Sequence, residues 1–240
     1  MIPTDLELVS QGDRRALSRL LTAVVEASDP HVLEALSPAR DVAGFTGPPG
    51  AGKSTLVDQL IRLERRKGRR PGVVVIDPSS PLTGGALLGD RIRMQDHAGD
   101  EDVYIRSLAT RGKLGGLATG VEPVLAGLAL AGFSPLFVET VGVGQTEIEI
   151  VSVAQTVVVV LHPGWGDDVQ AAKAGLLEAA DIVFINKADL GGAERAAGQL
   201  RTSLEVPVLV GAALTGEGVE ELAAEIAGHQ TSPRSTPNSA

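Results

Sequence analysis

The 240-residue chain has no cysteine, few aromatic residues and no long apolar run. Without cysteine it can form no disulfide, thiolate metal site or thiol nucleophile, and it suits a reducing compartment. Because Phe, Tyr and Trp make up only 2% of the chain, its core must be built from Val, Leu, Ile and Ala. No charged-then-apolar leader opens the sequence, and no apolar run approaches the roughly 18–20 residues of a membrane span. We therefore expect a soluble, cytoplasmic protein.

The chain also lacks an excess of positive charge, since its formal net charge is −9. This balance argues against general binding to nucleic acid or to anionic membranes. A length of 240 residues suits one α/β domain with a large core and leaves little room for two full domains.

One stretch matches the pattern G-x-x-x-x-G-K-[ST] of the phosphate-binding loop, with an apolar run before it and helical spacing of apolar residues after it. Backbone N–H groups of such a loop, with the positive end of the following helix, surround a polyphosphate, and glycines allow the close approach. The lysine reaches the β- and γ-phosphates, and the next hydroxyl ligates the accompanying magnesium. The predicted phosphate-binding residues are Gly47, Pro48, Pro49, Gly50, Ala51, Gly52, Lys53, Ser54 and Thr55.

Two further apolar runs end in an acid. Residues 73–76 are followed by Asp77, and residues 135–138 are followed by Glu139. An acid at the carboxyl end of a parallel strand faces the ligand crevice, and Glu139 lies where such an acid would hold magnesium through water. The Gly-rich stretch between Asp77 and Asp90 suits either a switch around magnesium and the γ-phosphate or an ordinary Pro/Gly/Ser turn.

The stretch after Glu139 suits a second switch. Gly142 would supply a backbone N–H that senses the γ-phosphate. No His or Cys is placed as a nucleophile, so we expect direct attack of water on GTP, with Lys53 and backbone N–H groups stabilising the developing charge. Either Gln145 or a switch acid would position this water.

A guanine-selecting pattern, N-K-x-D, follows the apolar run at residues 182–185. A carboxylate at Asp189 would accept two hydrogen bonds from the N1–H and N2–H₂ edge of guanine, which adenine lacks. Asn186 and Lys187 complete the pattern, which predicts GTP rather than ATP. The loop that supports the base in many GTPases would be formed by Ala212, Ala213 and Leu214.

Periodic Leu and Val residues predict a helix from Asp5 to Ala27, and a short second helix is expected at residues 31–36. We interpret residues 1–40 as a helical N-terminal extension and residues 41–228 as a P-loop GTPase domain. The Ser-, Thr- and Pro-rich residues 229–240 are predicted to be a disordered tail.

A basic cluster lies at the end of the helix predicted from Lys53 to about Lys67. It would be either a patch for an acidic partner or a solvated helix end whose cations complement the helix dipole, with Gly68 as the stop. We favour the second interpretation. The cluster consists of Arg62, Arg65, Arg66, Lys67, Arg69 and Arg70.

Taken in order, these motifs resemble those of the MeaB/ArgK family, P-loop GTPases of the signal-recognition-particle/MinD/BioD class. The resemblance runs from about residue 5 to residue 227. Besides the phosphate loop it rests on Asp77-Pro-Ser-Ser-Pro, Thr83-Gly-Gly, Leu88-Gly-Asp-Arg, Glu139-Thr-Val-Gly-Val-Gly-Gln and Asn186-Lys-Ala-Asp.

The resemblance implies a GTPase chaperone that gates adenosylcobalamin loading of methylmalonyl-CoA mutase and protects that enzyme. This chain has no D-x-H-x-x-G cobalamin signature, so cobalamin would belong to the mutase. The implied magnesium ligands are Ser54, Asp77, Asp90 and Glu139. The implied guanine contacts are Asn186, Lys187 and Asp189. A third switch that transmits the nucleotide state would contain Asp167, Gln170 and Lys173.

The chain departs from the family pattern at two places. Ala212-Ala213 replaces the usual Ser-Ala, which removes a hydroxyl but keeps a backbone N–H, so base affinity would be slightly lower. Family members also continue into a C-terminal arm that forms a homodimer, whereas this sequence ends in a short polar tail. A homodimer is therefore left open.

The predicted fold is a P-loop NTPase three-layer α/β sandwich with a mostly parallel sheet and the nucleotide at the strands' carboxyl ends. Three other functions stay open: a transport-associated kinase of the arginine/ornithine type, a metallochaperone GTPase of the same class, and a nucleotide-dependent binding module that barely hydrolyses. The guanine pattern counts against the kinase, and the lack of Cys with only four His counts against the metallochaperone.

Overall fold

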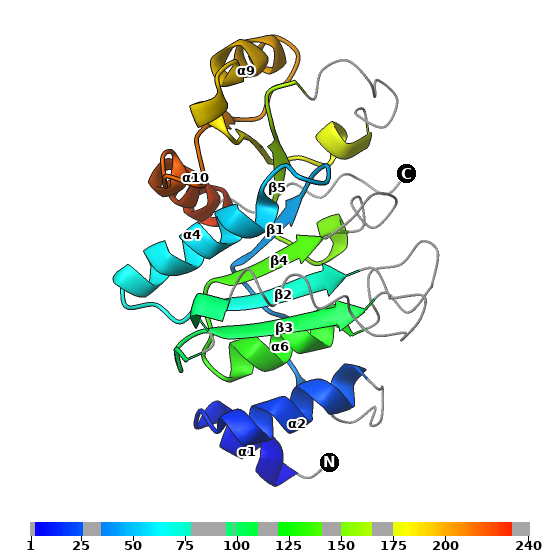
Figure 1. The fold of residues 1–240 in the computed structure, drawn as a ribbon. Helices are drawn as coiled ribbons and strands as arrows, with labels where there is room; N and C mark the ends of the chain where they lie inside the picture. The colour runs from blue at the N-terminus through cyan, green and yellow to red at the C-terminus, as the bar shows by residue number, and fades with distance from the viewer. Residues whose placement is uncertain are drawn as a thin grey trace, which may run out of the picture.

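Seven parallel strands form the central sheet of the part of the chain that the structure, a computed structural model, describes (Figure 1). Described are residues 3–25, 35–77, 95–97, 99–109, 120–140, 150–164 and 175–231. The strand order is β3-β2-β4-β1-β5-β6-β7, and every pair of neighbours is parallel. The strands are β1 (Val42–Thr46), β2 (Gly72–Asp77), β3 (Tyr104–Ala109), β4 (Leu136–Thr140), β5 (Thr156–Leu161), β6 (Ile182–Ile185) and β7 (Val208–Val210). The predicted α/β fold is confirmed.

Continuous apolar runs place side chains on both faces of this sheet. In β5, Val157 and Val159 belong to one core, whereas Val158 and Val160 belong to the other. This alternation is expected of a strand that is buried on both sides. The first core is covered by α2 (Arg14–Val25), α6 (Val121–Leu130) and α9 (Ala193–Arg201), and the second by α4 (Lys53–Arg66) and α10 (Val219–Thr231) (Figure 1).

The single N-terminal helix predicted from Asp5 to Ala27 is wrong, because the chain forms two helices there, α1 (Pro3–Ser10) and α2. Gly12 takes a φ of 89°, which ends the first helix. Asp13 then caps the second helix by accepting the backbone N–H groups of Arg15 and Ala16, each at 2.8 Å. These bonds, the one from Ala16 above all, lower the pKa of Asp13.

The N-terminal helices form an outer layer over α6 (Figure 1). Gly127 permits the contact, since a Cβ there would lie 2.8 Å from Cδ2 of Leu21. The buried side chains of α2 belong to the same core as those of β1 and β5. The extension therefore adds to the core of the sheet. The second helix expected at residues 31–36 lies largely outside the described residues.

The helix after the phosphate loop ends as predicted. Lys67 closes α4, and Gly68 follows with a φ of 73°. The N–H of Gly68 donates to the carbonyl of Arg65, and the N–H of Arg69 donates to that of Glu64, which satisfies the carbonyl groups at the helix end. At the other end of the domain, α10 continues to Thr231, three residues into the predicted tail of residues 229–240.

Three short 3₁₀ helices complete the described elements, namely η1 (Gln95–His97), η2 (Ile150–Ser152) and η3 (Ala188–Leu190). Across the described residues, no helix combines the length and the apolar character needed to cross a membrane.

Candidate nucleotide-binding site

The predicted phosphate loop connects β1 to α4, at the carboxyl end of the central strand. Gly47 has a φ of 140°, and a Cβ there would lie 2.1 Å from the carbonyl oxygen of Val160. Gly52 has a φ of 91°, and a Cβ there would lie 2.3 Å from Nδ2 of Asn186. Both conformation and space therefore require glycine at these two positions. The loop passes against the ends of neighbouring strands, as a backbone that binds phosphate must.

The two polar side chains that follow the loop are buried, Lys53 and Ser54 each being 6% exposed. Nζ of Lys53 donates to the carbonyl oxygens of Gly47 and Pro48, at 2.6 and 3.1 Å. The hydroxyl of Ser54 donates to Oε1 of Glu139 at 2.5 Å. The ammonium of Lys53 is thus held at the loop, and the hydroxyl of Ser54 is held at Glu139, the acid that the sequence predicts to bind magnesium.

Glu139 reaches Ser54 because of the sheet's register. It stands in β4 opposite Phe45 of β1 and Val75 of β2, one residue before the strand ends. The side chain of Glu139 is only 1% exposed. Burying a carboxylate is costly unless it is hydrogen bonded, and the Ser54 hydroxyl supplies one such bond. The fold thus brings Ser54 and Glu139, which lie 85 residues apart in sequence, into direct contact, while their role as magnesium ligands stays a prediction.

Asn186 links two loops of the site. Its Nδ2 donates to the carbonyl oxygen of Ala51 in the phosphate loop, and its Oδ1 accepts the N–H of Ala213, both at 2.8 Å. With 2% exposure, the carboxamide is enclosed between these loops. The sequence predicts a guanine contact for Asn186. In the structure its carboxamide also joins the two loops, a role that the sequence analysis missed, and the guanine contact stays a prediction.

The other residues predicted to meet guanine lie around this link. Lys187 takes a left-handed backbone conformation with a φ of 62°, which is rare for a residue with a side chain and is found at functional sites. Asp189 is exposed in η3, and Leu214 is 76% exposed beside the buried pair Ala212 and Ala213. An exposed carboxylate and an exposed apolar side chain are therefore available to a planar base.

Several predicted residues lie outside the described part of the chain. The backbone of Asp77 ends β2, paired with Ala109, but its side chain is not described. Among the described residues, no three His, Asp or Glu side chains gather closely enough to hold a metal ion. Ser54 and Glu139 are the described members of the predicted magnesium set. Not described are Asp90, Gly142, Gln145, Asp167, Gln170 and Lys173.

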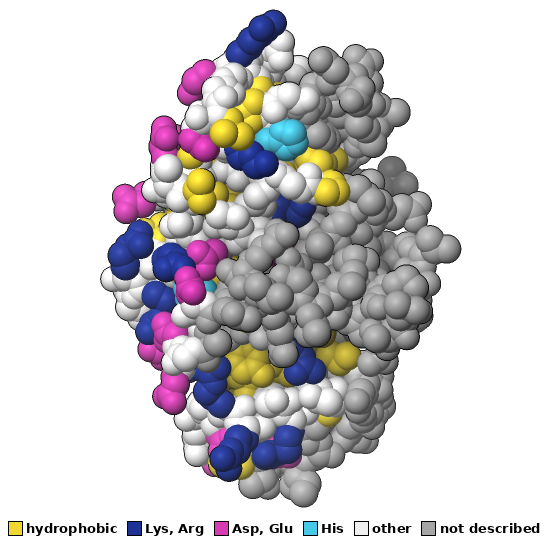
Figure 2. Space-filling view, viewed as in Figure 1, with side chains coloured by type: hydrophobic (Ala, Val, Ile, Leu, Met, Phe, Trp, Pro, Cys, Tyr) yellow, Lys and Arg dark blue, Asp and Glu magenta, His cyan; other side chains and the backbone are white. Residues whose placement is uncertain are grey.

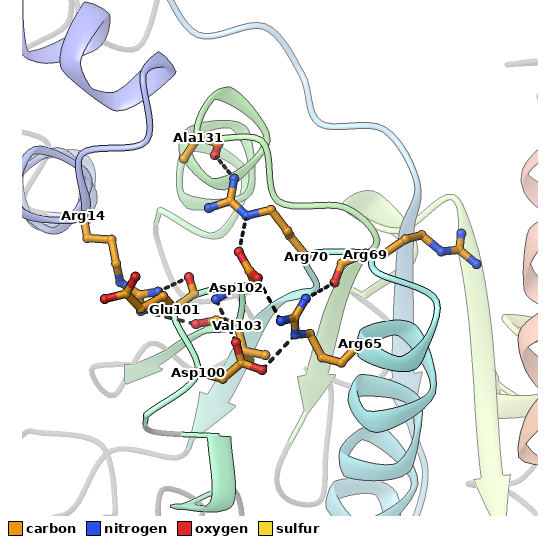
Figure 3. Close-up of polar contacts among 9 residues, drawn as sticks. All are labelled: Arg14, Arg65, Arg69, Arg70, Asp100, Glu101, Asp102, Val103 and Ala131. Carbon is orange, nitrogen blue, oxygen red and sulfur yellow. Dashed lines mark hydrogen bonds and ion pairs between the residues drawn. The ribbon is translucent and has the colours of Figure 1, made fainter.

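Five of the six residues of the basic cluster near the end of α4 pair with acids of the same chain, and Figure 3 shows the pairs of Arg65 and Arg70. Arg65 contacts Asp100 and Asp102, each at 2.8 Å, and Arg70 contacts Asp102 at 3.1 Å. Arg62 pairs with Asp58 and Asp96, while Lys67 and Arg69 pair with Glu64. Positive and negative side chains also lie interspersed along the left margin of Figure 2. The sequence interpretation as a solvated helix end did not include these ion pairs, which depend on acids of other segments.

The chain is similar to known proteins over most of its length. The family described as Methylmalonyl Co-A mutase-associated GTPase MeaB matches residues 17–239. A relative from Pyrococcus horikoshii that carries a GTPase name is 47% identical over 249 residues, covering 96% of this chain and 78% of the relative. The chain is also 41% identical over 203 residues to a fused isobutyryl-CoA mutase from Cupriavidus metallidurans, covering 81% of this chain and 18% of that protein.

Solved structures show the same fold. The crystal structure of an LAO/AO transport system kinase superposes with a TM-score of 0.72 at 25% identity, covering 95% of this chain and 74% of that one. The nickel complex of HypB from Helicobacter pylori superposes with a TM-score of 0.60 at 18% identity, covering 91% and 99%. This chain belongs to the MeaB family of GTPases, which confirms the predicted family and enzyme class.

Proposed function

We propose that this MeaB-family chain binds GTP with magnesium, hydrolyses it by direct attack of water, and acts as a nucleotide-switched chaperone of methylmalonyl-CoA mutase. In this role it would gate the loading of adenosylcobalamin and protect the mutase. The hydrogen bond between Ser54 and Glu139 carries the catalytic part of the proposal. It joins the end of the phosphate loop to an acid in the central part of the sheet, so a change at the phosphates can reach the sheet directly.

The residues present fit a magnesium ion. Mg²⁺ prefers oxygen ligands, keeps several waters, and is held by one or two carboxylates together with substrate phosphates. Ser54 and Glu139 offer a hydroxyl and a carboxylate oxygen that are already 2.5 Å apart. When bound there, magnesium would neutralise charge on the β- and γ-phosphates. Asp77 and Asp90 stay predicted contributors to this set.

The chain's own groups would position the phosphates. The backbone N–H groups of residues 50–54 lie at the start of α4, where the helix dipole favours an anion. The buried ammonium of Lys53 adds a fixed positive charge. Because these groups are held before the substrate arrives, they can stabilise charge that develops in the transition state without reorganising.

Guanine selection would come from the exposed carboxylate of Asp189, which can accept the two donors of the guanine edge. Leu214 would pack against the face of the base. The Asn186 link holds this loop at a fixed distance from the phosphate loop. Base and phosphates of one nucleotide can therefore be recognised together.

Support for a mutase partner comes from the family's description and from the fused isobutyryl-CoA mutase that contains a similar segment. A fusion places two activities in one chain, which is consistent with their working together. The direct test is the rate of GTP hydrolysis with and without purified methylmalonyl-CoA mutase. We expect a rise of about tenfold or more, equivalent to ~1.4 kcal/mol of barrier.

Lys53→Ala should abolish this rise, whereas Lys67→Ala, which removes a lysine from the far end of the same helix, should keep it. No rise and no co-elution with the mutase would reject the partner while leaving the GTPase in place.

A kinase function is the second candidate, because the LAO/AO transport system kinase is a close structural neighbour. Such a kinase would use ATP, so a comparison of ATP and GTP binding separates the two functions. Preference for ATP would favour the kinase.

A further inference from the structure

Two buried hydroxyl groups meet beside the phosphate loop, at the carboxyl ends of β1 and β4. Thr46 is 0% exposed and Thr140 is 2% exposed. Oγ1 of Thr140 lies 3.3 Å from Oγ1 of Thr46 and 3.4 Å from the carbonyl oxygen of Phe45, and its single proton can be donated to either acceptor. The contact therefore joins the last residue of β4 to the last residues of β1.

These threonines occupy a particular place relative to the loop. Thr46 directly precedes Gly47, where the loop starts, and Thr140 directly follows Glu139, which accepts the Ser54 hydroxyl at the loop's other end. Consecutive side chains of a strand point to opposite faces of the sheet. Accordingly Phe137 belongs to the core beneath α4, whereas Val138 belongs to the core beneath α6.

The end of β4 thus contacts Ser54 near the end of the loop and Thr46 directly before its start, once from each face. Glu139 contacts Ser54 on the α4 side, and Thr140 contacts Thr46 on the α6 side. These two contacts connect the residue before the loop and a residue near its end to the same strand.

Packing alone does not explain the hydroxyls. Thr140 pairs in register with Ile76, and Thr46 pairs in register with Val159, so each has an aliphatic neighbour on the adjoining strand. Valine has nearly the shape of threonine and suits such a buried strand position, whereas a buried hydroxyl has a cost unless it is hydrogen bonded. A functional reason for the hydroxyls is consistent with their position at the loop.

We infer that Thr140 is a positioning residue for GTP hydrolysis, whose hydroxyl holds the start of the phosphate loop in place relative to the strand that carries Glu139. This inference rests on the proposed GTP hydrolysis at the same site. It assigns to Thr140 a role through Thr46 and the loop backbone, without contact to the nucleotide.

The test compares Thr140→Val with Thr140→Ser in steady-state GTP hydrolysis. Thr140→Val keeps the shape and removes the hydroxyl, so we expect kcat to fall about tenfold, as expected for a small misplacement of reacting groups. KM should change by less than about twofold, because the contacts that bind the ground state remain. Thr140→Ser keeps the hydroxyl and should stay within about twofold of the wild-type kcat.

Thr156→Val provides the matched control. Thr156 is also 0% exposed in a strand, and its hydroxyl lies 3.0 Å from Nδ1 of His229 at the opposite, amino end of the sheet. Urea unfolding measures how far each of the two valine variants lowers the free energy of unfolding, so that an effect on kcat can be separated from a general loss of stability. Thr156→Val should lose stability to a similar degree and keep the wild-type kcat.

The inference is overturned if Thr140→Val keeps the wild-type kcat, if Thr140→Ser falls as far as Thr140→Val, or if Thr156→Val lowers kcat equally. The wild type is measured first. If it does not hydrolyse GTP, the proposed function is rejected, and this outcome is distinct from the failure of the inference about Thr140.

Discussion

The two ends of the sheet both gather charged side chains, but they satisfy them differently. At the amino end, Arg65 and Arg70 pair with Asp100 and Asp102 (Figure 3). At the carboxyl end, the cation of Lys53 donates to backbone carbonyl oxygens of the phosphate loop. Charges that neutralise one another within the chain hold the fold together. The ammonium of Lys53 lies at the phosphate loop, where its positive charge can act on a bound phosphate.

The amino-end network also connects parts of the chain that are distant in sequence. Arg14 of α2 donates to the carbonyl oxygens of Glu101 and Val103, and Arg70 donates to that of Ala131 after α6 (Figure 3). The loop before β3 is therefore a meeting point for the N-terminal extension, α4 and α6. We expect variants here to change stability, and variants at the carboxyl end to change nucleotide chemistry.

Lys53→Ala should have the largest effect. The variant removes a buried cation that faces the phosphates, so hydrolysis of GTP should fall by roughly 100-fold or more, as for the loss of one main charge stabiliser. Single-turnover kinetics measure the effect, and the unfolding midpoint should change little. Retention of at least half of the rate would contradict the assignment.

Asp189→Asn should change base selection. The carboxamide can no longer accept both donors of the guanine edge, so GDP affinity should fall by about 100-fold or more. Xanthosine diphosphate presents a carbonyl where guanine has an amino group, so it should bind to the variant more tightly than it binds to the wild type. Isothermal titration with both nucleotides gives the comparison, and unchanged GDP affinity would show that another residue selects the base.

Asn186→Ala should affect both properties, because this residue joins two loops of the site. The variant leaves the carbonyl of Ala51 and the N–H of Ala213 without their buried partner, which should cost about 1–3 kcal/mol of unfolding free energy. GDP affinity should fall as well, since the loops lose their fixed spacing. If stability falls while GDP affinity stays the same, the link is structural only.

Asp102→Asn should have a smaller and purely structural effect. Asp102 is 46% exposed and Arg65 is 25% exposed, so solvent screens the pair and the loss should be roughly 0.5–1 kcal/mol. Urea unfolding measures this loss. GTP hydrolysis per folded molecule should equal that of the wild type, and a lower rate would show that the two ends of the sheet are coupled.

The pH dependence of this network should be the smallest effect. The hydrogen bond from Arg65 is the main cause that lowers the pKa of Asp100. A carboxyl whose pKa is lower in the folded state stabilises the fold above its unfolded pKa of about 3.9, and this contribution disappears as pH falls through the folded pKa. The wild type should therefore lose more stability than Asp100→Asn as pH falls from about 5 towards 3. Parallel curves for the two proteins would contradict this account.

Much of the carboxyl end could be predicted from the sequence, because its chemistry depends on local patterns. The loop around Lys53, the acids Asp77 and Glu139 at or next to the ends of their strands, and the N-K-x-D segment are each part of a local pattern, and parallel strands bring their ends to one edge. The link through Asn186 was not predictable in this way. It depends on how closely two loops approach, which no local pattern specifies.

The amino end was predicted less well, for a related reason. The partners of Arg65 lie 35 and 37 residues further along the chain, so the sequence shows a basic run without its acids. The break between α1 and α2 was missed although Gly12 and Asp13 carry its signal, because the apolar periodicity continues across it. The hydroxyl pair of Thr46 and Thr140 likewise appears only once the strands are aligned.

The most direct test of this account is single-turnover hydrolysis of GTP and of ATP by the wild-type chain with magnesium, in the presence of the mutase. We expect hydrolysis of GTP that depends on Lys53 and little hydrolysis of ATP. Equal hydrolysis of both nucleotides would contradict base selection by Asp189, and hydrolysis of neither would contradict the catalytic role given to the carboxyl end of the sheet.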